Sequence, residues 1–364
     1  MKIAIINSKG FWSMGWTTDP ESQQATIESL NRLGIMTKAV EVSTLEELES
    51  TLTSLRLENW TLWPNAYEVA IAEGSSETAW IADRIEEQGL PMIGNKAHSL
   101  KTVMLKDTCQ YKLQQHGVAI PSFLAVETSD LPQLSELTQT QGLEFPLFVK
   151  PNALSSSKGV SQRSVVYSAE QLEQQVSDVG KQYGFPVMIE EYLPGQDITV
   201  AVFMTPETPT VLATYYDTEI YEDPGAVLDY DIRQRDWNDG KWLRVVDEPE
   251  MLEKIERVVI PACHAVDVSE FTRIDCRMDR NGNLKAFDIN GLPGLEHPFS
   301  TTVWQMIVKM ADKPELHAYD TLISLVLYCA ATQQQLKVPH QVEKLAKAYI
   351  AAEQSSKHSL TPEL

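Results

Sequence analysis

Short apolar runs alternate with amphipathic stretches over roughly the first hundred residues of the chain. Apolar runs predict buried strands, whereas apolar positions three and four residues apart, closed by a glycine, predict helices. The pattern predicts strands at 3–6, 36–42, 68–72 and 91–93, and helices at 21–33, 45–55 and 76–88. Because strand and helix alternate, we expect an α/β layer built on a parallel sheet.

Two further units follow, and both mix helices with strands. The smaller has a helix from 106 that stops at His116-Gly117, a strand at 145–149, a serine-rich turn at 154–159 and a helix at 169–183. The larger has strands at 187–190 and 198–203, a polar loop at 216–242, a helix at 249–265 and a hairpin. We place domains at 1–103, 104–185 and 186–335, followed at 336–364 by a helix and a loose polar tail that starts near 355.

Three side chains with oxygen donors lie on the predicted hairpin. Residues 272–278 and 284–289 are expected to be strands, because the turn 279–283 is rich in residues that tolerate a left-handed backbone. Asp288 and Asn290 share one face of their strand, and Asp275 faces them from the partner strand. Mg²⁺ commonly binds through one or two carboxylates together with substrate phosphates. The hairpin therefore predicts a metal site for a nucleoside triphosphate, although such residues are also common in purely structural turns.

Two lysines and the loop after the second are candidates for binding phosphates. Lys106 and Lys150 could act as point charges, and Lys150 ends an apolar strand, where its ammonium needs a partner. The serines and glycine of the loop 155–159 could fold hydroxyls and backbone amides over phosphate oxygens. Taken alone, each lysine is equally typical of a protein surface, and the loop of a plain turn.

The segment Glu190-Glu191-Tyr192-Leu193, followed by Asp197, suggests an adenine site. Glu190 or the main chain at Glu191 and Leu193 could pair with the adenine amino edge. Leu193 could cover the ring, and Asp197 could accept hydrogen bonds from ribose hydroxyls. Acids at a strand end are otherwise simply solvated.

Composition narrows the choice of partners. The 364 residues are 43% hydrophobic and 22% charged, with a net charge of -21 that argues against nucleic acid or an anionic membrane as a partner. An anionic nucleotide then requires a local basic pocket. The four cysteines are widely separated and predict buried thiols in a reducing compartment, namely Cys109, Cys263, Cys276 and Cys329. With no apolar run of membrane-spanning length and a short apolar strand at the start, we expect a cytoplasmic protein.

Read together and in order, these motifs resemble the ATP-grasp fold and, within it, the D-alanine-D-alanine ligase family. The resemblance covers roughly residues 90 to 300, starting at LPMIGN and VMLKD and ending at RIDCRMD and FDINGLPGL. It implies an α/β (α+β) ATP-grasp architecture, in which a Rossmann-like N-terminal domain precedes two α+β subdomains that enclose ATP. It also implies ATP-dependent formation of a carbon–nitrogen bond, and often a homodimer.

The same resemblance assigns roles to individual residues. The residues implied to bind ATP are Lys106, Lys150, Ser156, Ser157, Glu190, Glu191, Leu193 and Asp197. Asp275, Asp288 and Asn290 would hold two Mg²⁺ ions, with Mn²⁺ as a possible substitute. Arg273 and the Gly294 amide would stabilise the developing negative charge, and Ser156 would act in the loop over the γ-phosphate.

The chain departs from the family where the first substrate should bind. The glutamate expected in the Gly-rich first segment has no clear match in residues 7–22, and 72–77 lack the expected His-Gly and Gly-Glu-Asp-Gly pattern. The usual lysine is missing from the loop 216–235, which leaves Arg233 or Arg235 as substitutes. Five side chains are candidates for contacting substrate, namely Trp12, Trp16, Tyr216, Arg233 and Ser300.

Phe11, Trp12 and Trp16 suit a ring-bearing or bulky acid better than the methyl group of alanine, unless they simply pack in the core. One such relative joins an amino acid to mycosporine-glycine, a cyclic ketone. We therefore expect a small-molecule acid or ketone and an amino acid as substrates. The alternatives are a D-alanine-D-alanine ligase of peptidoglycan synthesis, a non-catalytic ATP-binding regulatory protein, and a kinase-like enzyme that stops at the phosphorylated acid.

Overall fold

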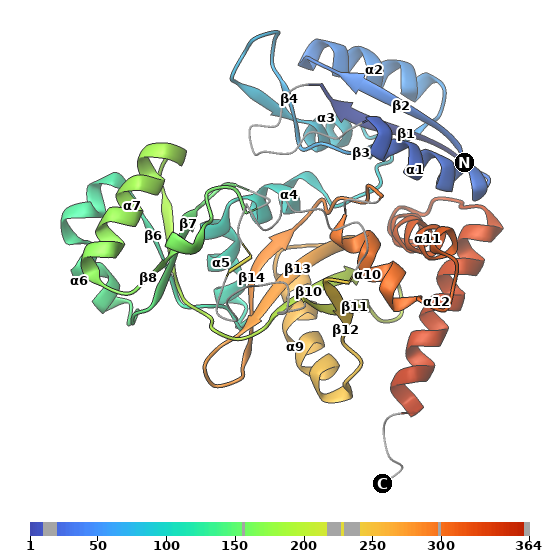
Figure 1. The fold of residues 1–364 in the computed structure, drawn as a ribbon. Helices are drawn as coiled ribbons and strands as arrows, with labels where there is room; N and C mark the ends of the chain where they lie inside the picture. The colour runs from blue at the N-terminus through green and yellow to red at the C-terminus, as the bar shows by residue number, and fades with distance from the viewer. Residues whose placement is uncertain (10–19, 155–156, 217–226, 229–240, 298–299, 360–364) are drawn as a thin grey trace.

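The fold is taken from a computed structural model, which describes residues 1–9, 20–154, 157–216, 227–228, 241–297 and 300–359 (Figure 1). The first unit is a parallel sheet in the order β2-β1-β3, made of β1 (Lys2–Ser8), β2 (Met36–Val42) and β3 (Thr61–Pro64). Helices α1 (Pro20–Arg32), α2 (Leu45–Leu57) and α3 (Ile81–Glu87) accompany it. The parallel α/β layer predicted from the alternating pattern is confirmed.

The structure corrects two predicted elements of this layer. Thr78–Trp80 forms β5, where the sequence predicted the first turn of a helix, and pairs antiparallel with β4 (Glu68–Ala70). Trp80 also packs edge-on against Tyr67, and this tertiary contact favours the extended backbone that aromatic and β-branched residues adopt readily. The strand predicted at 91–93 is only a single bridge between Met92 and Leu62.

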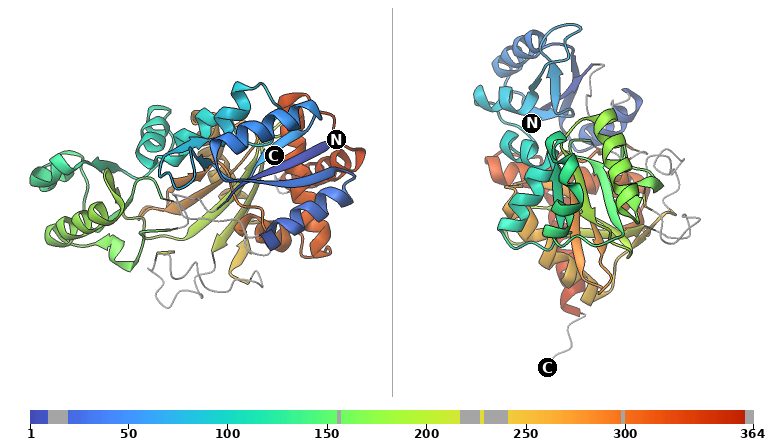
Figure 2. Two further views of the ribbon diagram at one scale, coloured as in Figure 1. Left: turned by 90° about the horizontal axis from the view of Figure 1, so that it is seen from above. Right: turned by 90° about the vertical axis from the view of Figure 1, so that its left-hand side faces the viewer.

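A four-stranded antiparallel sheet in the order β6-β9-β7-β8 forms the second unit. Its strands are β6 (Phe123–Val126), β7 (Leu147–Pro151), β8 (Val165–Val166) and β9 (Val187–Glu191), and α6 (Leu134–Thr140) and α7 (Ala169–Tyr183) accompany them. Figure 2 shows this unit, in green, at one end of the molecule. The boundary expected at 186 would separate β9 from its sheet, because local sequence does not reveal that β9 pairs with β6 and β7.

The third unit is a five-stranded antiparallel sheet in the order β12-β11-β10-β13-β14. Its strands are β10 (Asp197–Phe203), β11 (Thr210–Tyr216), β12 (Leu243–Val245), β13 (Phe271–Met278) and β14 (Leu284–Asn290). The helices around it are α4 (Ala97–Met104), α5 (Lys106–Gln115), α9 (Pro249–Ala265), α10 (Thr301–Lys309) and α11 (Glu315–Gln334). β13 and β14 confirm the predicted hairpin to within a residue at each end.

This sheet is buried on both faces. Val200 and Val202 of β10 point into a core shared with α5 and α9, whereas Ala201 and Phe203 point into a core shared with α11 and β1. Successive residues of a strand face opposite sides, so the apolar run fills two cores at once. The sheet is therefore a rigid support for the side chains on β13 and β14.

The C-terminal helix is longer than predicted. α12 spans His340–Ser359, so residues 355–359 are helical where we expected a loose tail, and residues 360–364 lie outside the described part. Val342, Ala346, Tyr349 and Ile350 recur at helical spacing and pack in the core beside α11. No helix in the described residues has the length and apolar character needed to cross a membrane.

A buried carboxyl links the first unit to the third. Glu270, which is 1% exposed, accepts hydrogen bonds from the Gly94 amide at 2.6 Å and from the Gln334 side chain at 2.8 Å. Asn95 adds hydrogen bonds to the backbone at Phe271 and Gly291. Burial raises the pKa of Glu270 to about 8, against the opposing effect of these donors.

We expect Glu270→Gln to change how stability depends on pH. The Glu270 carboxyl has a pKa of about 8 in the folded protein, against a reference value of 4.5. Because the folded protein binds this proton more tightly, the protonated carboxyl stabilises the fold. That contribution is complete below the reference pKa and is lost as pH rises to about 8. The wild type should therefore lose up to ~1.4 kcal/mol of unfolding free energy per pH unit relative to the variant. Urea unfolding across this pH range measures the difference, and parallel curves for the two proteins would contradict the expectation.

Candidate active site

The β13–β14 hairpin places two acids directly opposite each other. Asp275 pairs with Asp288 in the strand register, and Arg273 pairs with Asn290. A bulge follows, because Cys276 pairs with Ala286 and leaves Phe287 without a partner. The hairpin therefore brings together the three residues predicted to bind metal, in the arrangement that the sequence suggested.

Arg273 lies against the first of these acids. Its Nε and Nη2 atoms each donate to Asp275 at 3.2 Å, and Thr199 donates to the same carboxylate at 2.8 Å. Burial opposes the charge on Arg273, but Asp275, Tyr216 and Asp288 together outweigh burial and raise the pKa of the guanidinium. Arg273 is therefore a fixed positive charge beside the paired acids.

Lys106, at the start of α5, lies beside the second acid. Its Nζ is 3.2 Å from Asp288 Oδ1 and donates to the Leu154 carbonyl at 2.9 Å. Burial alone would raise the pKa of Asp288, but Lys106 and Lys150 outweigh burial and hold it below its usual value. Asp288 is therefore ionised and can bind a metal through its oxygens. Asn290 Nδ2 lies 3.5 Å from Asp288 Oδ2.

Lys150, on β7, makes a second and more deeply buried ion pair. Its Nζ is 2.8 Å from Glu190 Oε2, with side chains 4% and 3% exposed. The same ammonium donates to the Phe287 carbonyl at 3.3 Å, which the bulge leaves available. Lys150 therefore links the smaller sheet to β14 at the position of the paired acids.

Glu190 has one oxygen still to be satisfied. Its Oε1 is buried and has no hydrogen-bond partner among the described residues. Burial raises the pKa of Glu190, and Lys150 acts in the opposite direction. A buried acceptor of this kind is rare and is suited to a donor supplied by a ligand.

Other residues predicted for the adenine site have different surroundings. The Glu191 carboxylate accepts a hydrogen bond from Lys285 at 2.6 Å. Only the main chain of Glu191 therefore remains a candidate for binding adenine. Leu193 is buried, and Asp197 lies 3.5 Å from Arg277. Glu191 and Asp197 thus have protein partners of their own and do not join the Lys150–Glu190 pair.

The loop after β7 contacts the segment that follows β11. The Ser157 hydroxyl donates to the Leu228 carbonyl at 2.8 Å, and Gln162 donates to the Val227 carbonyl at 3.0 Å. Ser157 has a φ of 55°, in the left-handed region that the turn requires. The sequence did not predict this contact between two loops far apart in the chain.

Three predicted substrate residues, Trp12, Trp16 and Arg233, lie outside the described residues, as does Ser156 of the predicted phosphate loop. Tyr216 ends β11, and its ring stacks on Trp242 at 5.7 Å between centroids. Ser300 precedes α10, and its hydroxyl donates to the Gly294 carbonyl. Ser300 therefore already fixes the loop that carries Gly294.

Sequence reasoning missed Tyr67, which lies between β3 and β4. Its hydroxyl accepts a hydrogen bond from the Leu292 amide at 3.0 Å. Burial raises the pKa of Tyr67, and Asp288 acts in the same direction. The first unit thus contributes a side chain to the site, and no local sequence pattern around Tyr67 signals this.

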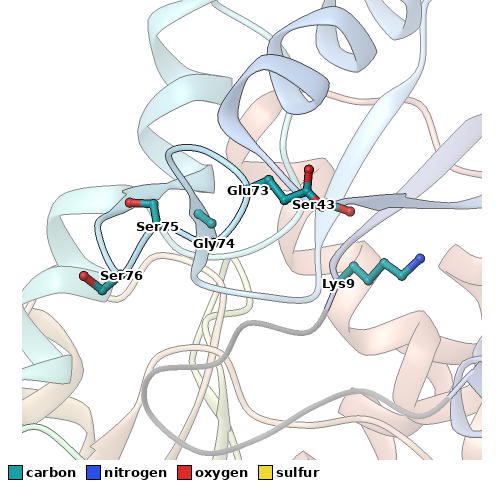
Figure 3. A pocket seen from close by; sticks show the side chains of 7 residues that line it. Lys9, Ser43, Glu73, Gly74, Ser75 and Ser76 are labelled. Carbon is teal, nitrogen blue, oxygen red and sulfur yellow. The ribbon is translucent and has the colours of Figure 1, made fainter.

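A separate recess of about 610 Å³ lies beyond the carboxyl ends of β1, β2 and β4 (Figure 3). Its lining includes Lys9, Ser43 and the Glu73-Gly74-Ser75-Ser76 turn, which is the segment where the family pattern is altered. In Figure 3 the Lys9 amine points away from Ser75 and Ser76. The polar groups of the recess therefore do not converge on one ligand atom.

The donor set at the hairpin fits a hard cation. No cluster of three or more His, Cys, Asp and Glu side chains able to hold a metal occurs in the described residues. Two carboxylates and one amide suit Mg²⁺, which keeps several waters and takes further oxygens from phosphates.

Known proteins resemble this chain over most of its length. The family described as D-ala D-ala ligase C-terminus matches residues 113–324. A D-alanine--D-alanine ligase from Bacillus anthracis is 24% identical over 256 residues, which cover 69% of this chain and 75% of the relative.

Solved structures agree on the fold. The crystal structure of D-alanine--D-alanine ligase from Bacillus anthracis complexed with ATP has a TM-score of 0.63 at 17% identity, and covers 92% of this chain and 99% of that one. VanG D-Ala:D-Ser ligase from Enterococcus faecalis has a TM-score of 0.61 at 16% identity, covering 89% and 99%. The chain has the ATP-grasp fold and belongs to the D-alanine-D-alanine ligase family. It is an ATP-dependent, ADP-forming carbon–nitrogen ligase.

We expect Lys150→Met to destabilise the protein by about 3–5 kcal/mol, because it leaves Glu190 buried without its cation. Lys150→Met combined with Glu190→Leu should recover most of that loss, since both charges are then removed. Urea unfolding without nucleotide measures both effects.

Lys347→Met provides the control for this experiment. Lys347 pairs with Glu343 on the exposed side of α12, so its loss should change stability far less than the loss of Lys150. If Lys150→Met were as mild as Lys347→Met, the buried pair would not have the importance assigned to it.

Proposed function

We propose that this ligase uses ATP to activate a substrate carboxylate or ketone and joins it to the amino group of an amino acid. The observation that carries the proposal is the meeting of the Lys150–Glu190 and Lys106–Asp288 pairs at β14, next to the opposed acids. Cations for phosphates, a buried acceptor and ionised oxygens for a metal are thus gathered where the two sheets meet.

In this proposal the two lysines bind the phosphates and the β9 edge binds the nucleoside. Glu190 Oε1 is a buried acceptor that the adenine amino group would satisfy. The main chain of Glu191, the side chain of Leu193 and Asp197 would complete the adenine and ribose contacts. Ser156 and Ser157 would close over the γ-phosphate, and Ser157 already lies against Leu228.

Asp275, Asp288 and Asn290 would hold the metal, as two Mg²⁺ ions in our proposal. Bound there, the metal would neutralise phosphate charge. Asp288 supports this role because its pKa is lowered, so it offers an ionised oxygen at neutral pH. Arg273, fixed by two hydrogen bonds to Asp275, would stabilise negative charge on the reacting group, and the Gly294 amide would do the same.

The substrates are proposed from relatives whose names specify D-alanine or D-serine. D-Alanine is therefore the first amino acid to test. Mycosporine-glycine remains the narrower candidate, because Phe11, Trp12 and Trp16 could form an aromatic pocket, although these residues lie outside the described part. Tyr216, Arg233 and Ser300 remain candidate substrate contacts, and a homodimer is part of the same proposal.

We expect phosphate release from ATP that depends on an added amino acid. The assay measures phosphate across D- and L-amino acids, alone and together with mycosporine-glycine. Strong release with D-alanine alone would favour dipeptide synthesis, whereas release that requires the cyclic ketone would favour the narrower candidate. A lack of release under every condition would contradict the proposal, and amine-independent release would indicate a kinase-like enzyme.

We expect Asp288→Asn to lower this activity by about 100-fold or more, because the site loses an ionised metal ligand beside the phosphates. Chelation with EDTA should also abolish activity, and added Mg²⁺ or Mn²⁺ should restore it in the wild type. Asp267→Asn is a suitable control, since Asp267 is paired with Lys112 in an exposed position. Full activity in Asp288→Asn would rule out the metal assignment.

A further inference from the structure

The proposed function leaves one buried carboxyl beside the site unused. Glu296 is 8% exposed and lies in the loop between β14 and α10. A Cβ added to Gly294 would lie 2.5 Å from Glu296 Oε2, so the carboxylate is in contact with that glycine. Glu296 is therefore an immediate neighbour of the glycine proposed to stabilise charge on the reacting group.

The groups around Glu296 are polar but neutral. Burial raises the pKa of Glu296, while the polar groups of its own backbone, the Asn65 side chain and the Leu295 backbone act in the opposite direction. Asn65 also donates to Asn7 Oδ1 at 3.1 Å. Asn7 belongs to β1 and Asn65 directly follows β3, so the carboxyl ends of two parallel strands face Glu296. Ligands of α/β sheets commonly bind at this edge.

Glu296 differs from the other acids of the site in having no cation. Asp275 has Arg273, Asp288 has Lys106 and Glu190 has Lys150. No Lys, Arg or His in the described part of the chain forms an ion pair with Glu296. A buried carboxylate without a counter-charge is unfavourable, and a cationic ligand group would stabilise it.

We infer that Glu296 binds the ammonium group of the amino acid whose carboxylate is activated, and so selects α-amino acids as acyl donors. The inference rests on the proposed function. An ammonium held by a carboxylate keeps its proton and cannot attack as a nucleophile, so the held group belongs to the acyl donor.

The dimensions of an α-amino acid agree with this assignment. Its nitrogen and its carboxyl carbon are roughly 2.5 Å apart, as standard bond lengths and angles require. Groups that hold the two ends must therefore be neighbours. Gly294, proposed to stabilise charge on the carboxyl end, and Glu296 are such neighbours.

The experiment compares donors that differ only in the amino group. D-Alanine and D-lactate serve as acyl donors, or else the best amino acid of the phosphate-release panel and its α-hydroxy analogue. Hydroxylamine serves as the common acceptor, and formation of the hydroxamate is measured. In the wild type the amino acid should be preferred.

Glu296→Gln should raise KM for the amino acid about 10- to 100-fold, leave KM for ATP unchanged and remove most of the preference over the hydroxy acid. Glu270→Gln is the matched control, because it replaces another buried carboxyl with an amide without touching Gly294. That control should keep the wild-type preference, which separates loss of stability from loss of recognition.

Glu296→Asp covers the case in which the glutamine variant does not fold. It keeps the charge but withdraws it by one methylene, so the preference should fall partway. Wild-type KM and preference in whichever variant folds would overturn the inference. A wild type without amine-dependent phosphate release would instead contradict the proposed function, so the two failures are distinguishable.

Discussion

The direct pairing of Asp275 with Asp288 across β13 and β14 is the constraint on which the site depends. Two carboxylates held this close in a buried hairpin repel each other unless cations lie beside them. Arg273 meets one, and Lys106 meets the other from the start of α5. The bulge at Phe287 leaves a carbonyl for Lys150, which attaches the smaller sheet to the same point. The geometry of the candidate site and the packing of two units thus have a common electrostatic origin.

Local sequence signals were sufficient where an element is determined by its own residues. The Asn-Gly turn and the alternating strands defined the β13–β14 hairpin, and α7 and α9 have the bounds predicted from sequence. Elements determined by pairing were predicted less well. β5 and the place of β9 depend on partner strands distant in sequence, and α12 extends beyond its expected end. Short-range patterns do not encode such contacts.

The site shows the same division. Lys106, Lys150, Asp275 and Asp288 could be selected individually, because their residue types suit phosphates and metal. Their pairing could not be predicted, since Lys106 and Asp288 lie in separate units of the sequence. Tyr67 and Glu296 had no signal at all, because a tyrosine in a loop and a glutamate before a helix are ordinary in sequence. Tyr67 and Glu296 become candidates only because the folded chain brings the first unit against the loop after β14.

Charge balance explains how so acidic a chain can bind a triphosphate. Lys106, Lys150 and Arg273 already balance Asp288, Glu190 and Asp275 in the folded protein, so the site is close to neutral before any ligand arrives. In the proposed function, metal would replace Lys106 as the partner of Asp288, which frees that ammonium for phosphate. Nucleotide and metal would therefore bind more tightly together than separately, because the positive charge of the metal offsets the negative charge of the phosphates.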